Sequence, residues 1–233
     1  MLRVNSRHRL NIILNLVISS LILILGISSI IVSAYVKAPE NFLFEFRYMT
    51  VNGTVFTSII AFMILIVSII EAKSGKYSIA DRLYYFRLSS AVTESIIAVV
   101  IAMSFFPAVP DSPNILSYES FNMHVIIPIL SIVSFLLNRS PRETMHPLLR
   151  LNCAWLITIY ASIVITLILT GTMPQDKIPY SFLDFRTRSI WYIVYFGFFI
   201  YSFTYVLSYI FTNLNKRMSS FWNPNDKKPV SSN

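Results

Sequence analysis

Residues 11–36 read NIILNLVISSLILILGISSIIVSAYV, which is 26 positions in a row without a charged side chain. A helix needs about 20 mostly apolar residues to cross the hydrocarbon core of a bilayer. Comparable uncharged runs occupy 48–70, 151–175 and 189–215. Of all 233 residues, 55% are hydrophobic and 13% are charged, whereas soluble domains carry about 25% charged residues. The composition therefore excludes a soluble enzyme, a disordered chain and a disulfide scaffold, and it predicts a polytopic membrane protein.

The apolar runs predict an all-α membrane bundle of six transmembrane helices, in a single domain over residues 1–212. A flexible cytoplasmic tail is expected over 213–233. The first apolar run is far longer than the roughly 7–15 residues of a signal-peptide core, so we expect it to remain as a helix. The six spans are placed at 11–36, 50–70, 88–109, 121–138, 150–171 and 189–212.

Lysine and arginine fall unevenly on the two sides of this arrangement. Fourteen of the 19 lie on the side of the two termini, including Arg87 in the loop before the third span, and five lie on the other side. Because loops rich in Lys and Arg remain cytoplasmic, both termini are expected in the cytoplasm, with the chain in the cell membrane. The net charge of +8 is then a topology signal. The expected partners are membrane lipids and not nucleic acid, and no oligomeric state is indicated.

The histidines and the single cysteine do not form a recognisable metal motif. His8 and His146 lie in predicted cytoplasmic segments, whereas His124 lies at the outer side, so the three cannot share one site. Cys153 has no second cysteine with which to form a disulfide or a zinc site. We therefore expect neither a metal nor a cofactor.

Polar side chains gather at the predicted outer ends of the helices. The second span opens with Arg47, Thr50, Asn52, Thr54 and Thr57, the fourth with His124, and Asp184 precedes the sixth. The second, fourth and sixth helices all begin at this surface, where their unpaired N–H groups and positive dipole ends meet. Such a place suits a developing negative charge, so it can stabilise an oxyanion without a metal.

Each of these residues also has a structural interpretation. Thr50 is most simply the N-cap of the second helix, and His124 is a core or interfacial histidine bonded to a neighbouring carbonyl. Thr54 and Thr57 commonly return their hydroxyls to the backbone one turn earlier, and Asp184 can cap the sixth helix or pair with a nearby arginine. Glu94, inside the third span, is a structural hydrogen-bond anchor or part of an ion path; an anchor is the preferred interpretation.

Three segments together resemble a known family. They are Arg47-Tyr48-Met49-Thr50, His124-x-x-x-Pro128 and Pro179-Tyr180-Ser181-Phe182-Leu183-Asp184, in this order, within a likeness that spans about 44–212. The chain resembles the androgen-induced-gene family of integral membrane hydrolases, and more specifically its bacterial relatives. One departure is Ser181, where relatives have proline in a Tyr-Pro-Phe-Leu segment.

The resemblance implies a catalytic pair made of a threonine and a histidine. Animal members of that family hydrolyse fatty acid esters of hydroxy fatty acids. The matching motifs assign the role of nucleophile to Thr50 and the role of base to His124. A backbone carbonyl or Asp184 would orient the imidazole, and Arg47, Asn52, Thr54 and Tyr180 would support the site or bind substrate. The leading hypothesis is thus a lipid-ester hydrolase working at the outer leaflet. The alternatives are a non-catalytic membrane protein and a small proton-coupled transporter that uses His124 and Glu94. The hydrolase hypothesis requires the Thr50 and His124 side chains to lie within about 3–5 Å of each other.

Overall fold

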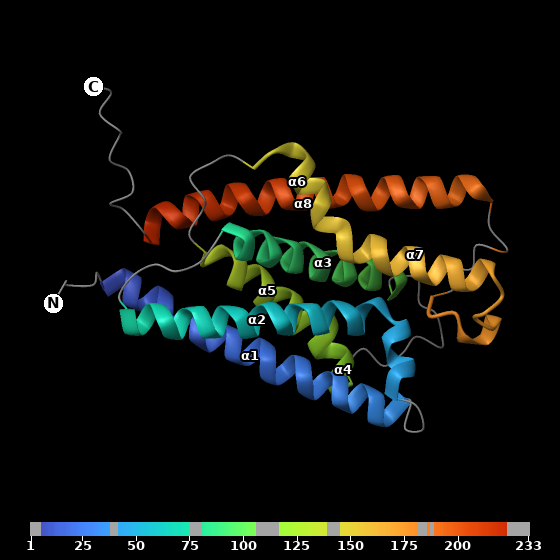
Figure 1. Ribbon diagram of the computed structural model, residues 1–233, viewed down its shortest axis with the longest axis horizontal. Helices are drawn as coiled ribbons and strands as arrows, with labels where there is room; N and C mark the ends of the chain where they lie inside the picture. The colour runs from blue at the N-terminus through green and yellow to red at the C-terminus, as the bar shows by residue number, and fades with distance from the viewer. Residues whose placement is uncertain are drawn as a thin grey trace.

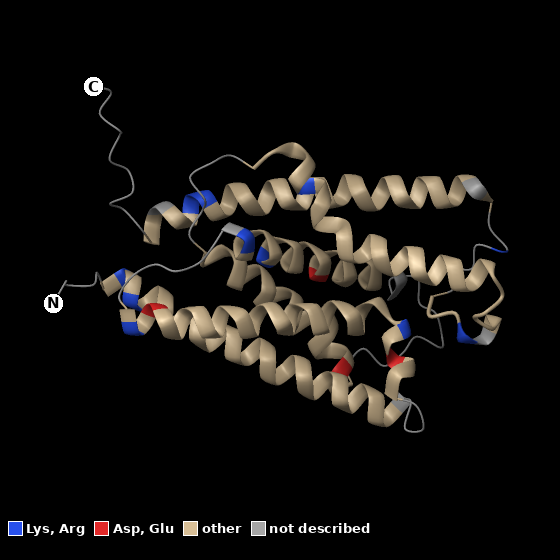
Figure 2. Cartoon of the chain, viewed as in Figure 1, with Lys and Arg blue, Asp and Glu red and all other residues tan. Residues whose placement is uncertain are grey.

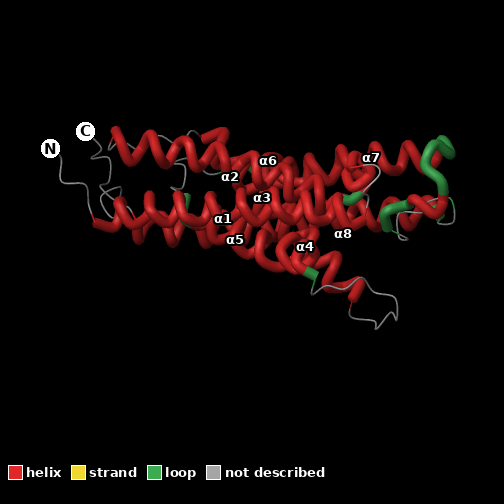
Figure 3. The backbone as a smooth tube through the Cα atoms, turned by 90° about the horizontal axis from the view of Figure 1, so that it is seen from below, coloured by secondary structure: helices red, strands yellow, loops and turns green. Residues whose placement is uncertain are grey.

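The computed structural model describes residues 6–37, 42–74, 81–105, 117–138, 145–180, 186 and 189–222. These residues form helices and connecting turns, with no strand among them (Figures 1 and 3). The helices in chain order are α1 (Ser6–Lys37), η1 (Phe42–Arg47), α2 (Met49–Ser74), α3 (Asp81–Phe105), α4 (Tyr118–Phe121), η2 (Asn122–Ile126), α5 (Ile127–Leu136), α6 (Pro147–Leu151), η3 (Asn152–Ala154), α7 (Trp155–Leu169), η4 (Gln175–Lys177) and α8 (Ile190–Trp222).

Six segments of the described chain are long and apolar enough to cross a membrane. They are Ser6–Val36, Met49–Ser74, Arg82–Ala102, Tyr118–Leu136, Pro147–Leu169 and Trp191–Ser219. The fourth joins α4, η2 and α5, and the fifth joins α6, η3 and α7. The predicted all-α class and the six spans are confirmed, and the chain is a multi-pass membrane protein. Helices satisfy every backbone hydrogen bond internally, which the bilayer core requires.

Helix α3 lies at the centre of the bundle, where it contacts α2, α5, α8 and η3. It is the most buried of the six spans, and α8 is the least buried. Apolar side chains on most of the outer surface of α8 are exposed, as expected for a helix whose neighbour on that side is lipid.

The beginning of α1 and the end of α8 lie at the same end of the bundle (Figure 1), where the Arg7 guanidinium donates to the Phe221 carbonyl at 3.3 Å. We call this the terminal end. Many of the described lysines and arginines gather there (Figure 2). The other end, where α2 begins, is called the site end.

Arg87 is a buried part of the bundle and not the loop residue that the sequence predicted. Its side chain is 2% exposed within α3. The guanidinium donates to Asn15 of α1 at 2.6 Å, to Ser134 of α5 at 2.6 and 2.9 Å, and to Asn138. Buried charge is tolerated only when its hydrogen bonds are supplied, and these neutral acceptors fix α1, α3 and α5 relative to one another.

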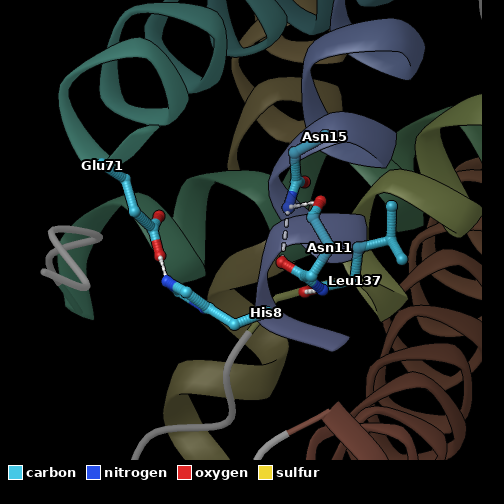
Figure 4. Close-up of polar contacts among 5 residues, drawn as sticks. All are labelled: His8, Asn11, Asn15, Glu71 and Leu137. Atoms are coloured by element: carbon cyan, nitrogen blue, oxygen red, sulfur yellow. Dashed lines mark hydrogen bonds and ion pairs between the residues drawn. The ribbon is translucent and has the colours of Figure 1, made fainter. Parts of the chain in front are cut away.

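Two further contacts tie α1 to its neighbours near the terminal end (Figure 4). His8 Nε2 lies 3.4 Å from Glu71 Oε1 in the last turns of α2. The Asn11 amide donates to the Leu137 carbonyl at 2.9 Å, and Asn15 in turn donates to Asn11. These four polar side chains of the terminal end therefore have partners within the structure.

The predicted tail must be corrected in part, because α8 does not end at 212 but continues to Trp222. The reason is tertiary: the Asn215 amide is wholly buried and donates to the carbonyls of Phe135 and Asn138 at 3.2 and 2.8 Å. The two carbonyls lie at the end of α5 and just beyond it, and α8 supplies a side-chain donor to both. Residues 223–233 of the predicted tail lie outside the described residues.

Candidate functional site

Thr50 and His124 meet at the site end of the bundle. The Thr50 hydroxyl oxygen lies 3.3 Å from Nε2 of His124, although 74 residues separate them in sequence. This distance falls within the range that the hydrolase hypothesis requires. Thr50 is the second residue of α2, so it is not the residue that precedes the helix, as the N-cap interpretation would have it. Its side chain is 5% exposed.

The other imidazole nitrogen is oriented by the chain itself. Nδ1 of His124 lies 2.8 Å from the carbonyl oxygen of Ser120 and 3.1 Å from the Ser120 hydroxyl. A carbonyl can only accept a hydrogen bond, so Nδ1 carries the proton in this arrangement. Nε2 is then the acceptor that faces Thr50, which is the tautomer a general base needs. A backbone carbonyl, one of the two orienting groups considered from the sequence, is thus bonded to Nδ1; the other, Asp184, lies outside the described residues.

A π-helical turn presents His124 to Thr50. The turn η2 spans Asn122–Ile126, and the Ile127 N–H donates to the Asn122 carbonyl five residues earlier. Pro128 follows directly and has no N–H with which to bond the His124 carbonyl. The segment before Pro128 thus contains one wider turn, a feature frequent at functional sites.

The joint between η1 and α2 holds Thr50 in place. The Asn52 side-chain amide donates to the carbonyls of Phe46 and Tyr48 at 2.7 and 2.8 Å. The Tyr160 hydroxyl, from α7, donates to the intervening Arg47 carbonyl at 2.6 Å. Three successive carbonyls are thus bonded by side chains, while the first N–H groups of α2, which have no partner within their own helix, face the site.

Tyr180 completes the polar cluster. Its hydroxyl oxygen lies 3.4 Å from the Thr50 hydroxyl oxygen, and its ring packs edge-on against Tyr48 with centroids 6.0 Å apart. Burial raises the pKa of Tyr180 above its ordinary value of 10, although contacts with Thr50 and with the backbone of Met49 oppose the shift. The phenol therefore remains protonated at neutral pH.

An apolar cavity ends on this cluster. It lies between α2, α3, α7 and α8 and encloses an empty volume of about 510 Å³, including its mouth. Its polar lining groups are the hydroxyls of Thr50, Tyr160 and Tyr180. The remaining lining residues are apolar: Met49, Ile96, Ile97, Val100, Ile101, Ile157, Ala161, Phe196 and Ile200. A cavity of this kind fits a hydrocarbon chain whose polar group lies beside Thr50.

The other residues proposed from the sequence fall into different places. Arg47 lies beside the cluster, with its guanidinium 3.8 Å from the centre of the Phe44 ring and donating to the Tyr48 hydroxyl at 2.6 Å. The Thr54 hydroxyl is fully buried and has no hydrogen-bond partner among the described residues, so no bond joins it to the cluster. Asp184 lies outside the described residues.

Glu94 belongs to the bundle interior, deeper along α2 than Thr50. Its side chain is wholly buried, and Oε1 accepts a hydrogen bond from Thr57 at 2.8 Å. Thr57 is seven residues beyond Thr50, which places it about 10 Å deeper along α2. Thr57 also contacts Ser90, which contacts Ser131 at 3.1 Å. Glu94 therefore links α2 to α3, as the anchor interpretation expected, and Thr57 bonds across the helices and not back to its own backbone.

Sequence reasoning missed two residues that hold the cluster. Ser120 stands four positions before His124, and this one-turn spacing was a signal that could have identified it. Tyr160 lies in the middle of an apolar run 113 residues from Arg47, and nothing local marks it. Across the part of the chain that the structure describes, no group of three or more His, Cys, Asp and Glu side chains is placed to hold a metal ion.

Comparison with known proteins adds no relative: the chain matches no protein-family model, no curated protein and no solved structure.

Proposed function

We propose that this protein is an integral membrane hydrolase of lipid esters, in which Thr50 is the nucleophile and His124 the general base. The observation that carries the proposal is the 3.3 Å contact between the Thr50 hydroxyl and Nε2 of an imidazole whose Nδ1 is bonded to the Ser120 carbonyl. A nucleophile, a base and a group that orients the base are the parts that covalent catalysis by a hydroxyl requires.

The reaction follows from these positions. The Thr50 hydroxyl gives its proton to Nε2 as its oxygen attacks the ester carbonyl, and a tetrahedral oxyanion forms. When this intermediate collapses, the alcohol leaves with the proton from Nε2, and the acyl group remains on Thr50. Water then attacks the acyl-threonine and gives a proton to Nε2 of His124. When this second intermediate collapses, Nε2 returns the proton to the Thr50 oxygen and the fatty acid is released.

The substrate class follows from the cavity and its depth. The lining is apolar apart from three hydroxyls at one end, which suits a fatty acyl chain. Thr50 lies at the beginning of the segment Met49–Ser74 that can span the membrane, and therefore at the depth of the lipid headgroups, where ester bonds lie. With cytoplasmic termini, as the Lys and Arg distribution favours, this depth belongs to the outer leaflet of the cell membrane.

An activity-based fluorophosphonate probe tests the proposal on the full chain in membranes. We expect the probe to label the wild-type protein at Thr50, and Thr50→Ala and His124→Ala to abolish labelling and lower ester hydrolysis by about 10⁴-fold or more. Thr166→Ala and His146→Ala are matched controls, because both side chains are exposed and neither lines the cavity; they should label normally. Labelling that persists in both site variants would remove the proposal.

A second candidate is a small proton-coupled transporter, which the buried Glu94 and its hydroxyl neighbours favour. Carriers place ionisable groups near the bilayer midplane. Proton-dependent uptake that is lost in Glu94→Gln and unchanged in Thr50→Ala would support this candidate over the hydrolase. If neither variant changes any activity, a non-catalytic lipid-binding protein is the remaining alternative.

A further inference from the structure

Three hydroxyls line the polar end of the cavity, and each has a different use. The Thr50 hydroxyl faces Nε2 of His124 at 3.3 Å. The Tyr160 hydroxyl donates its only proton to the Arg47 carbonyl at 2.6 Å, so this proton is committed to the backbone. The Tyr180 hydroxyl lies 3.4 Å from Thr50 on the same cavity wall. Of the three, Tyr180 is the one placed to act on a group bound beside the nucleophile.

The direction of the hydrogen bonds in this cluster is determined by its acceptors. Nδ1 of His124 donates to the Ser120 carbonyl, so Nε2 must accept, and the donor is the single proton of the Thr50 hydroxyl. Thr50 has no second proton to give. The contact between Thr50 and Tyr180 therefore runs from the phenol to the threonine, and the phenolic proton is already directed at the reacting oxygen.

We infer that Tyr180 is a third catalytic residue, whose hydroxyl donates a hydrogen bond to the ester carbonyl oxygen as that oxygen becomes an oxyanion. This inference rests on the proposed hydrolysis at Thr50. As the Thr50 oxygen bonds to the carbonyl carbon, the π electron pair of the carbonyl moves to the carbonyl oxygen. The Tyr180 O–H then donates its hydrogen bond to that oxygen and no longer to Thr50. The phenol keeps its proton throughout, because the proton of Thr50 goes to His124.

The surroundings of Tyr180 make it a fixed donor. The backbone N–H groups of Met49 and Thr50 face the phenol oxygen, and donors to an oxygen strengthen the hydrogen bond that its own proton makes. The Tyr48 ring meets the Tyr180 ring at 74°, and Ile178, Tyr192 and Phe196 pack in the same apolar cluster. Burial raises the pKa of Tyr180, so the donor is present at neutral pH. A preoriented donor of this kind costs no reorganisation when the negative charge develops.

The test is Tyr180→Phe in the purified full chain in lipid nanodiscs, with a fatty acyl nitrophenyl ester as substrate and the corresponding uncleavable ether as ligand. Loss of one oxyanion donor lowers kcat by about 10²–10³-fold, and we expect this loss with unchanged affinity for the ether. Tyr192→Phe is the matched control, because it removes a hydroxyl from the same apolar cluster; its kcat should equal that of the wild type.

Two results would overturn the inference and leave the proposed function intact. One is a Tyr180→Phe protein that retains wild-type kcat while Thr50→Ala is inactive. The other is a loss of ether affinity by the same factor as the loss of kcat/KM, since this would make Tyr180 a substrate-binding residue only. A Thr50→Ala protein with wild-type activity would instead overturn the function and the inference together.

A second substitution tests the inference if Tyr180→Phe destabilises the protein and lowers its Tm. Replacement of Tyr180 by 3-fluorotyrosine keeps the ring and hydroxyl and makes the phenol a stronger donor. This replacement should raise kcat without changing the ether affinity, and an unchanged kcat would contradict the inference.

Discussion

A main-chain atom, the Ser120 carbonyl, orients His124. The Ser120 carbonyl lies 2.8 Å from Nδ1 and the Ser120 hydroxyl lies 3.1 Å from it. The carbonyl is four residues earlier on the same segment, so the acceptor and the ring are carried by one stretch of chain. A carboxylate at this depth would need desolvation that a peptide carbonyl does not. The peptide bond thus supplies an acceptor that favours the tautomer with the proton on Nδ1.

Ser120→Ala distinguishes the contribution of the Ser120 carbonyl to the orientation of His124 from that of the Ser120 hydroxyl. Alanine keeps the carbonyl and removes only the hydroxyl, so the loss of kcat/KM for ester hydrolysis should be less than about tenfold, the equivalent of one ordinary hydrogen bond. His124→Ala, measured in parallel, should lose at least about 10³-fold more. If the two substitutions reduce kcat/KM equally, the hydroxyl and not the carbonyl orients the imidazole.

At the scale of the element, the η2 turn decides which way His124 faces. A π-helical turn holds one residue more than an α-turn, with N–H groups bonded five residues back, as the Ile127 N–H is to Asn122. One added residue in a turn rotates everything before it by about 100° relative to everything after it. The orientation of His124 toward α2 thus depends on this extra residue.

Deletion of Val125 removes the extra residue and leaves His124, Pro128 and the length of α5 unchanged. We expect an α-helical turn in which His124 is rotated by about 100° from Thr50, and a loss of probe labelling similar to that of His124→Ala. Circular dichroism should show the helical content retained. Wild-type labelling of this deletion variant would mean that the π-turn does not position His124.

The joint of η1 and α2 is the second element on which the site depends. Asn52 bonds the carbonyls on either side of Arg47, and Tyr160 bonds the Arg47 carbonyl itself. The first turn of α2 is thereby held from α7 as well as from its own helix. This arrangement explains why Asn52 belongs with the site although its side chain contacts backbone and not Thr50.

In the molecule as a whole, the cavity is shared by four helices at the site end. Its walls come from α2, α3, α7 and α8, over residues 49–200. The terminal end is closed instead by the buried guanidinium of Arg87 and by Asn215. The bundle is therefore fixed by polar contacts at one end and open to an apolar ligand at the other.

Ala161→Phe tests whether this cavity holds the acyl chain. Ala161 lines the cavity from α7, and a phenyl ring there would fill part of it. We expect KM for esters of long-chain acids to rise at least about tenfold, the effect of losing about two buried methylene contacts, while esters of short-chain acids are cleaved as before. Ile210→Phe, at an exposed position of α8, is the matched control. An unchanged chain-length preference in Ala161→Phe would show that the chain lies elsewhere.

Local sequence patterns were enough to predict the class of the protein and the number of its spans. Each apolar run is a local property, and a chain in hydrocarbon must bond its own backbone, so 11–36 and the other runs could only be helices. The positions of Thr50 and His124 at helix beginnings could also be predicted, because N-terminal turns and Pro128 leave local signals.

The tertiary structure alone decided the rotation of each helix and the contacts that follow from it. The 3.3 Å approach of Thr50 to His124, and the approach of Tyr180 to Thr50 across 130 residues, depend on packing that no local pattern encodes. For the same reason Arg87 was expected in a loop and 213–222 in a tail. Both are buried or helical because their partners lie on other helices, and the free energy of a buried polar group depends on those partners.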